Sequence, residues 1–231
     1  MQILFACDLD NTLIHSHKHR RADDICVEIF DGREQSFISP RALDLIKKIS
    51  ARIFFVPVTT RSVVQYRRIF WAENFSPRFA VAANGAFFLN GMRQENFLRE
   101  AVEPFADELK LQLDMADEKI FSIARIVDES FLFLKCRDDF DAEIFFDTSL
   151  TVRRTGKKIY LFPPGLNKGA ALLKLKKIFA AEKIFAAGDS EIDLPMLERA
   201  DVAFAHENLC AEKFFSFAEP EDFLEEIFAS V

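Results

Sequence analysis

The chain has 231 residues, half of them apolar and 27 of them phenylalanine, which fits a globular protein with a buried core. Its formal net charge is −7 and its lysines and arginines are dispersed, so it lacks the basic surface that nucleic-acid binding requires. No apolar run is long enough to span a bilayer and no signal segment precedes the first predicted strand, so we expect a cytoplasmic protein without a membrane partner. The four cysteines lie far apart without a C-x-x-C pair, which favours core packing over a zinc site or disulfide bonds.

The first predicted element is a buried strand that ends in two carboxylates. Residues 3–7 form an apolar run, and Asp8 and Asp10 follow two positions apart, so both leave the strand on the same side. At the carboxyl edge of an open α/β sheet, such side chains face the ligand crevice. Two aspartates at this spacing are also typical of a solvated acidic turn. The motifs further along the chain have to decide between a reactive site and such a turn.

A loop and a hairpin follow this strand. The loop contains three alternating histidines, and the lack of further ligands and the neighbouring cations favour a solvated loop over a metal site. These histidines are His15, His17 and His19. Asp31-Gly32 predicts a tight turn between strands at residues 26–30 and 35–38. A helix is then expected after the N-cap Ser39.

The second and third core strands also end in polar residues. Residues 53–58 form an apolar run, and a helix is expected to start near Ser62. The residues between them are Thr59, Thr60 and Arg61. A hydroxyl group that faces a helix N-terminus suits an anion, but a simple capping box explains this pattern equally well, so both interpretations stay open. The third strand, residues 79–83, stops at Asn84-Gly85.

From residue 87 to residue 162 the pattern changes from alternating strands and helices to an αββαββ order after a short hairpin at Asn90-Gly91. The expected elements are a helix at 102–115, strands at 120–127 and 131–135, a helix at 139–146, and a hairpin of strands 150–154 and 158–162. The strands of such a run pair antiparallel, and one face of the resulting sheet is buried under the helices. We therefore expect a separate smaller domain at residues 87–162, inserted in a larger one, with Pro163-Pro164-Gly165 as the return linker.

The last part of the chain returns to the first pattern. Asn167-Lys168-Gly169 opens a helix, and by itself Lys168 is typical of an ordinary exposed lysine. A strand at residues 184–187 then ends at Gly188, with Asp189 and Asp193 just beyond it. A final core strand at 202–205 and a closing helix at 220–229 complete the chain.

These strand ends should meet in one place. The sequence predicts an α/β fold, a Rossmann-like, doubly wound and mostly parallel sheet made by residues 1–86 and 163–231, whose carboxyl ends share one edge. Four carboxylates cannot stay ionised together there without compensation, and one lysine is not enough. Mg²⁺ suits such a site best because it needs few protein ligands and keeps places for water and phosphate. The carboxylates are those of Asp8, Asp10, Asp189 and Asp193.

Four motifs in this order resemble those of the haloacid dehalogenase-like superfamily of phosphotransferases. They are D-L-D-N-T-L at the first strand end, T-T-R after the second strand, N-K-G, and G-D-S-E-I-D-L-P-M-L. The resemblance covers residues 1–86 and 163–231, and the inserted domain looks like the cap of the sugar-phosphate phosphatase branch. Trehalose-, sucrose- and mannosylglycerate-phosphate phosphatases and phosphomannomutases are similar in layout.

The resemblance implies a role for each motif residue. Asp8 would attack phosphorus and become an aspartyl-phosphate, and Asp10 would protonate the leaving oxygen and then activate water. Thr59 would hydrogen-bond the phosphoryl group and Lys168 would neutralise it. Asp8, the main-chain carbonyl of Asp10 and Asp189 would hold Mg²⁺.

Two positions depart from the family pattern. Asn11 stands where glycine is usual, which is tolerable because Asn accepts a left-handed backbone better than most residues. Ile192 stands where this branch commonly has Asn, so either Asp193 takes more of the metal-binding duty or the metal is held less tightly.

The function implied is Mg²⁺-dependent hydrolysis of a small phosphorylated metabolite, in particular a sugar phosphate, by a monomer or homodimer. A sugar phosphomutase and a non-catalytic binding protein remain as alternatives, and no residue separates a phosphatase from a mutase. Asp10 argues against dehalogenases, which have no leaving alkoxide to protonate.

The hairpin at residues 150–162 is expected to select the substrate. Alternation places Arg153, Lys158 and Tyr160 on one face, which we expect to point at the core crevice, with simple solvation of these side chains as the alternative. The other predicted substrate-binding residues lie at the core strand ends and are Thr60, Arg61 and Asn84.

Overall fold

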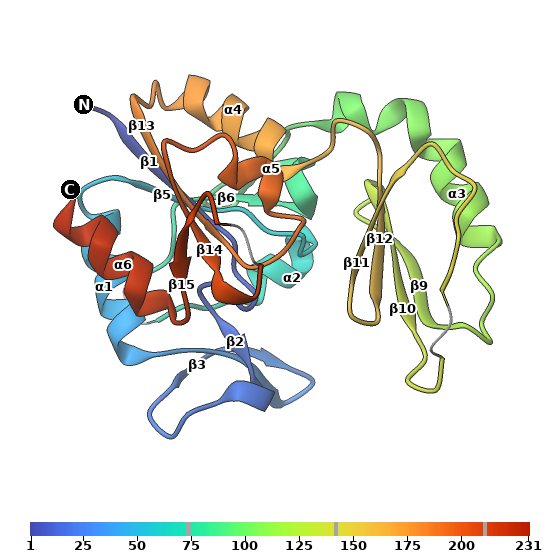
Figure 1. Ribbon diagram of the computed structural model, residues 1–231, viewed down its shortest axis with the longest axis horizontal. Helices are drawn as coiled ribbons and strands as arrows, with labels where there is room; N and C mark the ends of the chain where they lie inside the picture. The colour runs from blue at the N-terminus through green and yellow to red at the C-terminus, as the bar shows by residue number, and fades with distance from the viewer. Residues whose placement is uncertain (73–74, 141–142, 210–211) are drawn as a thin grey trace.

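The computed structural model of the protein describes residues 1–72, 75–140, 143–209 and 212–231. Figure 1 shows two units beside each other, a larger one that contains both ends of the chain and a smaller one built from its middle part. The chain leaves the larger unit once and returns to it once, so the smaller unit is an insertion. The predicted α/β fold with an inserted α+β unit is confirmed.

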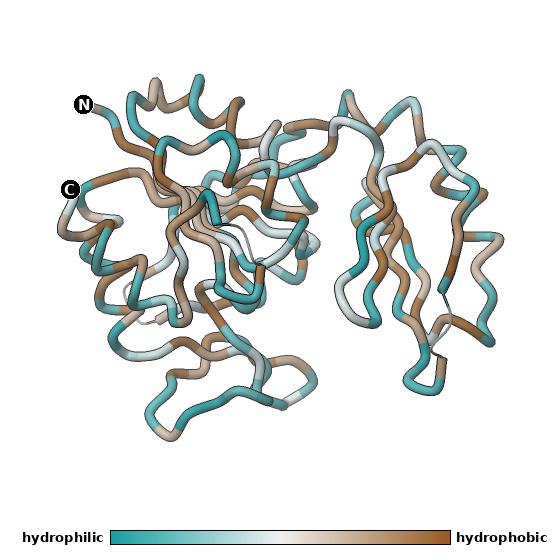
Figure 2. The backbone as a smooth tube through the Cα atoms, viewed as in Figure 1, coloured by the Kyte–Doolittle hydropathy of each residue, from teal (hydrophilic) through white to brown (hydrophobic). Residues whose placement is uncertain are grey.

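A parallel sheet of five strands forms the centre of the larger unit. Its order is β15 (Phe215–Phe217), β14 (Val202–His206), β13 (Lys183–Gly188), β1 (Ile3–Cys7) and β5 (Phe54–Pro57), with every neighbouring pair parallel. The middle strands are near-continuous apolar runs because helices cover both faces of the sheet. Figure 2 shows hydrophobic residues concentrated in these strands.

Helices lie on both faces of this sheet. The pair α1 (Pro40–Ser50) and α6 (Pro220–Ala229) packs together on one face, and the pair α4 (Lys168–Ile178) and α5 (Leu194–Leu197) packs on the other. α1 begins as predicted at the N-cap Ser39, whose hydroxyl accepts a hydrogen bond from the N–H of Ala42 at 3.0 Å. None of the helices in the described ranges has the length and apolar character needed to cross a bilayer.

A small antiparallel sheet, here called the flap (residues 15–38), lies between β1 and α1. It consists of β2 (His15–Ser16), β3 (Ile25–Phe30) and β4 (Arg33–Ile38), with the 3-10 helix η1 (His17–His19) after β2. Asp31 and Gly32 both have positive φ, 51° and 70°, so the turn is of the primed kind that the Asp-Gly pair predicts.

A second hairpin lies closer to the core than the sequence pattern suggests. β6 (Phe79–Ala82) pairs with β7 (Phe87–Asn90), which pairs with β8 (Arg93–Asn96), and a parallel bridge between Val58 and Val81 continues the central sheet to β6. Residues 87–96 therefore belong with the core by pairing. We propose that the inserted unit, here called the cap, comprises residues 99–162.

The cap is an antiparallel sheet with helices packed on one side. The helices are η3 (Arg99–Ala101), η4 (Glu103–Phe105) and α3 (Ala106–Asp114), and the strands are β9 (Phe121–Val127), β10 (Phe131–Cys136), β11 (Thr151–Thr155) and β12 (Lys158–Phe162). The strand order is β11-β12-β10-β9. The helix predicted at 139–146 is not formed at residues 139–140 and 143–146, while residues 141–142 lie outside the described part of the chain. A helix of about two turns is only marginally stable by itself, so the apolar pattern of these residues is not enough to form it.

Candidate active site

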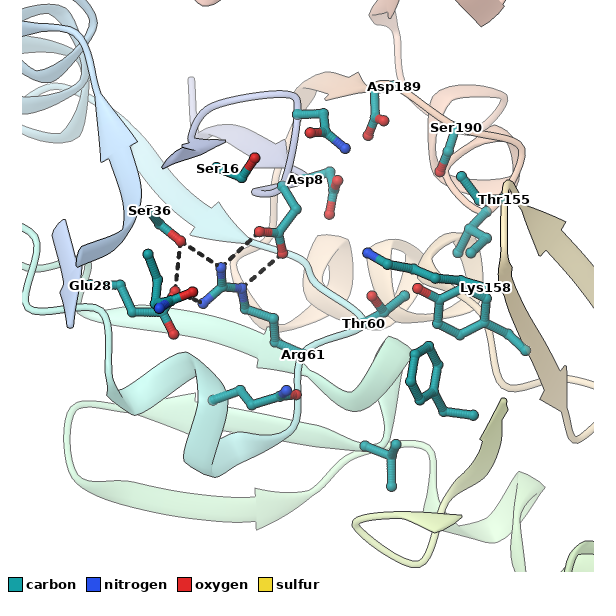
Figure 3. Close-up of a pocket in the computed structure, with 18 of the residues that line it drawn as sticks. Asp8, Ser16, Glu28, Ser36, Thr60, Arg61, Thr155, Lys158, Asp189 and Ser190 are labelled. Atoms are coloured by element: carbon teal, nitrogen blue, oxygen red, sulfur yellow. Dashed lines mark hydrogen bonds and ion pairs between the residues drawn. The ribbon is translucent and has the colours of Figure 1, made fainter. Parts of the chain in front are cut away.

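A pocket of about 490 Å³ opens where the carboxyl edge of the central sheet faces the flap and the cap. Figure 3 shows side chains from all three parts directed into it. Eight of the residues that the sequence predicts for the site line this pocket. They are Asp8, Asp10, Thr60, Arg61, Lys158, Tyr160, Lys168 and Asp189.

Lys168 connects two of the predicted carboxylates in the buried floor of the pocket. Its Nζ donates to Oδ1 of Asp8 and to Oδ1 of Asp193, both at 2.5 Å. Lys168 is the first residue of α4, and the next residue, Gly169, lies so close to α5 that a Cβ there would stand 2.0 Å from the Pro195 carbonyl oxygen. The glycine thus lets α4 approach α5 closely enough for the lysine to reach Asp193.

Asp193 also organises the loop after β13. Its Oδ2 accepts hydrogen bonds from the Ser190 N–H at 3.0 Å and the Ser190 hydroxyl at 2.8 Å. Gly188 ends β13 beside this carboxylate, and a Cβ at Gly188 would lie 2.4 Å from the Cβ of Asp193. Both oxygens of Asp193 are therefore engaged in holding the loop and Lys168, and its role as a metal ligand stays a prediction.

Three acidic side chains are close enough to share one metal ion. Within the described ranges, the carboxylate oxygens of Asp8, Asp189 and Asp193 form the only group of possible ligand atoms that all lie within 4.8 Å of one another. Burial, and then the negative charges nearby, raise the pKa of Asp8 well above its ordinary value although Lys168 opposes this. The pKa of Asp189 is raised mainly by burial as well. A divalent cation with a preference for oxygen fits this donor set, because one lysine balances only one of the three charges.

The first-motif loop keeps these groups in place. Asn11 has a φ of 63°, the left-handed conformation expected of it where glycine is usual. The hydroxyl of Thr12 donates to Oδ1 of Asp189 at 3.1 Å, and the N–H of Asp8 donates to the carbonyl of Ala187 at 3.0 Å. The strand end of β1 and the loop after β13 are thereby linked.

Asp10 is not part of the acidic group, because its side chain is bound by Arg61. The guanidinium donates from Nε at 2.8 Å and from Nη2 at 2.7 Å to the two carboxylate oxygens. Burial by itself would raise the pKa of Asp10, but these hydrogen bonds and the charge of Arg61 outweigh it, so the pKa lies below its ordinary value. Asp10 is held as a carboxylate in this arrangement.

Arg61 is in turn held by the flap. Its Nη1 donates to Glu28 at 2.8 Å, and Glu28 also accepts from the Ser36 hydroxyl at 2.6 Å and from Nε of Arg68 at 3.0 Å. The dashed lines in Figure 3 follow part of this network. Glu28, Ser36 and Arg68 all line the pocket and were missed by the sequence analysis. A buried acid in this position balances the charge that Arg61 brings into the protein.

Two predicted site residues lie behind the pocket wall. Thr59 is fully buried, and its hydroxyl accepts a hydrogen bond from the N–H of Arg61 at 3.1 Å. Asn84 has a φ of 56°, and its side-chain amide donates to the Leu166 carbonyl at 3.1 Å, just before α4. Neither lines the pocket, so their contacts with a substrate stay predictions.

The capping box, one of the two interpretations of the residues that follow Thr59, is present in the structure. In the five-residue α2 (Val63–Arg67), Ser62 and Gln65 make a reciprocal capping box. The N–H of Val63 donates to the carboxylate of Asp128, a cap residue in the turn between β9 and β10, at 2.7 Å. This bond joins the cap to the core at the mouth of the pocket.

The register of the cap hairpin puts Arg153, Lys158 and Tyr160 on one face of the sheet, as the alternation predicts. Arg153 stands opposite Tyr160 and Thr155 opposite Lys158, while Val152 pairs with Leu161 on the other face. Tyr160, Lys158 and Thr155 line the pocket, whereas the Nη1 of Arg153 donates to the Val152 carbonyl at 3.0 Å and Arg153 is not among the lining residues.

The same cap face carries lining residues that the sequence analysis missed. They are Arg125 and Val127 on β9 and Phe131 and Phe133 on β10. Phe133 stands opposite both Arg125 and Tyr160, so alternation along β9 and β10 would have found these residues once the cross-strand register was known.

The histidines of the flap do not gather around a common point. The Nε2 of His15 lies 2.6 Å from Oδ2 of Asp24, and His17 is at the rim of the pocket. Among the described residues, these histidines are absent from the groups that could share a metal ion.

Comparison with known proteins gives a family and a set of similar folds. Residues 87–212 match the family described as haloacid dehalogenase-like hydrolase, a stretch that includes Lys168, Asp189 and Asp193. No curated protein sequence matches the chain.

Three solved structures illustrate the fold similarity. The C-terminal domain of trehalose-6-phosphate phosphatase from C. albicans has a TM-score of 0.67 at 13% identity and covers 100% of this chain and 92% of that one. A haloacid dehalogenase-like hydrolase from B. subtilis has a TM-score of 0.61 at 17% identity, covering 97% and 98%. The sucrose-phosphatase from Synechocystis sp. PCC6803, in complex with sucrose and phosphate, has a TM-score of 0.59 at 16% identity, covering 99% and 98%. At these identities the likeness is one of fold, over the core and the cap together.

Proposed function

Because the chain belongs to the haloacid dehalogenase-like hydrolase family, we propose that it is a Mg²⁺-dependent phosphatase of small phosphorylated metabolites, specifically of a sugar phosphate, that works through an aspartyl-phosphate. The observation that carries this proposal is the buried group in which Lys168 bridges Asp8 and Asp193 beside Asp189. Phosphoryl transfer depends on positioning and charge cancellation, and this group supplies both.

The first step would be attack of Asp8 on the phosphorus of the bound ester. The carboxylate oxygen of Asp8 forms a bond to phosphorus, the bond between phosphorus and the ester oxygen breaks, and Asp10 gives a proton to the departing oxygen; for this step Asp10 has to be in its protonated form and released from Arg61. In the second step Asp10 takes a proton from water, the water oxygen bonds to phosphorus, and the aspartyl bond breaks. Lys168 stays beside Asp8 in both steps and balances charge on the phosphoryl group.

Mg²⁺ would be held by Asp8 and Asp189, with the main-chain carbonyl of Asp10 and the carboxylate of Asp193 as the further ligands expected from the sequence. When bound, it would cancel charge on the phosphoryl oxygens. Sugar phosphates are the proposed substrates because the sucrose-phosphatase and the trehalose-6-phosphate phosphatase share this fold with a cap over the pocket.

The test of this function is phosphate release from p-nitrophenyl phosphate and from a panel of hexose phosphates. We expect release that requires Mg²⁺, stops on chelation with EDTA and returns when Mg²⁺ is added back. Chromatography of the hexose products separates release of phosphate from isomerisation, which a phosphomutase would give. No release from any ester at millimolar Mg²⁺ would refute the proposed function.

The dual role of Asp10 makes a separate prediction, because Arg61 favours its carboxylate form and so opposes the acid role. Asp10→Asn should slow phosphoenzyme formation more for a sugar phosphate than for p-nitrophenyl phosphate, since only the sugar alkoxide needs a proton to leave. We expect the losses to differ by about tenfold or more. Rapid-quench measurement of the phosphoenzyme burst would show it, and equal losses would mean that Asp10 is not the general acid.

A further inference from the structure

The cap wall of the pocket has an unusual distribution of charge. Seven lining residues belong to the cap, and two of them, Arg125 and Lys158, are cationic while none is acidic. The flap adds Lys18 at the rim of the same pocket. A wall with one sign of charge attracts ligands of the opposite sign into the cleft.

Except for Asp189, which is a proposed ligand of Mg²⁺, the acids around the pocket are already paired with other cations. Arg61 and Arg68 bind Asp10 and Glu28, and Lys168 binds Asp8 with Asp193. In the part of the chain that the structure describes, Lys18, Arg125 and Lys158 make no ion pair with an acid. These three positive charges are therefore available to a ligand.

One scissile phosphate does not account for all three of them. The proposed position of that phosphate is beside Asp8, where Lys168 and the proposed cation balance it. A phosphate monoester carries about two negative charges near neutral pH, so three further cations on the walls exceed what it needs.

The cap surface between these cations is aromatic. One cross-strand row runs Arg153, Tyr160, Phe133, Arg125 over the four strands of the cap sheet. The ring centroids of Phe133 and Tyr160 lie 5.3 Å apart, and the guanidinium of Arg125 lies 5.7 Å from the Phe133 ring. Such a surface offers apolar contacts to a substrate ring, with a guanidinium beside them.

This surface is close to the reacting groups. Figure 3 shows the side chain of Lys158 extending from its cap strand towards the core residues that carry the carboxylates. Tyr160 lines the same pocket as Asp8 and Asp10, and burial, followed by the charges of these two acids, raises its pKa to about 12. A substrate held at Asp8 therefore faces this cap surface.

We propose that the preferred substrate carries a second anionic group, a carboxylate or a second phosphate, on the far side of a ring from the phosphate that is removed. Arg125 binds this second group, Tyr160 and Phe133 pack against the ring, and Lys158 lies on the side of the core carboxylates, where it faces the phosphate end of the substrate. The inference rests on the proposed phosphatase function and specifies its substrate class.

Three hexose derivatives that share one ring test it. Glucose 1-phosphate has no second anion, glucuronic acid 1-phosphate adds a carboxylate at C6, and glucose 1,6-bisphosphate adds a phosphate there. At a fixed free Mg²⁺ concentration we expect kcat/KM for at least one charged derivative to exceed that for glucose 1-phosphate about tenfold or more, the gain of one charge-assisted contact. Whichever derivative is preferred identifies the second group as carboxylate or phosphate.

Three variants connect this preference to the cap. Arg125→Gln should reduce the ratio of kcat/KM for the preferred charged derivative to kcat/KM for glucose 1-phosphate towards one, mainly through KM, whereas Lys158→Gln should lower kcat/KM for all three derivatives. Arg154→Gln is the matched control, because Arg154 is an exposed arginine of the same hairpin that does not line the pocket, and it should keep the wild-type ratio. A wild-type ratio near one, or a ratio that is the same in all variants, overturns the proposal.

A binding measurement keeps the two proposals separate. If no ester is hydrolysed, including p-nitrophenyl phosphate, the phosphatase function fails, and calorimetry with Asp8→Asn in Mg²⁺ decides the inference. Tighter binding of a charged derivative than of glucose 1-phosphate, lost in the Arg125→Gln background, supports it. Equal affinities, or no binding of any of the three, refute it.

Discussion

Asp8→Asn is expected to abolish phosphate release while the protein stays folded. The amide is nearly isosteric with the carboxylate but is not a nucleophile, and removing the nucleophile of a comparable covalent mechanism costs about four orders of magnitude or more in kcat. The measurement is the steady-state rate with p-nitrophenyl phosphate and with a hexose phosphate, together with trapping of the phosphoenzyme after acid quench.

Stability separates this result from simple unfolding. The Asn oxygen can still accept the hydrogen bond from Lys168, and the change removes one of three negative charges that lie close together. We therefore expect a free energy of unfolding within about 1 kcal/mol of the wild type in the absence of metal. The stabilisation that Mg²⁺ adds should be smaller in the variant, because one proposed ligand is gone. Wild-type turnover in Asp8→Asn would show that another residue attacks phosphorus.

The elements of the core could be predicted because each carries its own signal. Apolar runs of strand length, each followed by polar residues, mark β1, β5, β6 and β13, and parallel pairing then brings their ends to one edge. Asp8, Thr60 and Asp189 meet in the pocket for this reason. The sequence could not show that the side-chain amide of Asn84 binds the Leu166 carbonyl, because this contact depends on the left-handed backbone at Asn84.

The pocket residues that the sequence does not reveal are placed by partners that lie far away in the sequence. Glu28 sits at an irregularity in the pairing of β3 with β4, so alternation along β3 does not tell which way its side chain points. Arg125 and Phe133 reach the pocket only because the whole cap sheet turns this face to the core, which no local pattern encodes. The hairpin of β7 and β8 pairs with β6, and only the bridge between Val58 and Val81 connects β6 to the central sheet, a contact that the residues of the hairpin do not indicate.

Lys168→Met is expected to destabilise the protein strongly when no metal is bound. Lys168 is almost completely buried between Asp8 and Asp193, and burial, which by itself would lower its pKa, is outweighed by these two acids, so the pKa is raised. Methionine has a similar length but no charge, and it leaves two buried carboxylates without their cation. Breaking a buried ion pair in this way costs about 3–5 kcal/mol of the free energy of unfolding.

The destabilisation caused by Lys168→Met should depend on bound Mg²⁺ and on Asp193. Saturating Mg²⁺ should recover part of the loss, since a divalent cation replaces the missing positive charge beside Asp8 and Asp189. The double change Lys168→Met with Asp193→Asn should also recover part of it without metal, because it removes one of the unpaired buried charges. Urea unfolding of the wild type, of Lys168→Met and of the double variant, each with EDTA and with Mg²⁺, measures these differences in the free energy of unfolding.

Lys176→Met provides the control for the substitution itself. Lys176 is an exposed lysine on the same helix, so its replacement should change the free energy of unfolding by less than about 0.5 kcal/mol and should not respond to Mg²⁺. The Lys168→Met protein should also release phosphate far more slowly than wild type even where Mg²⁺ restores its stability, because the cation that faces the attacked phosphoryl group is lost. If Lys168→Met is as stable as Lys176→Met in EDTA, the buried ion pairs of Lys168 with Asp8 and Asp193 do not contribute to the stability of the folded protein.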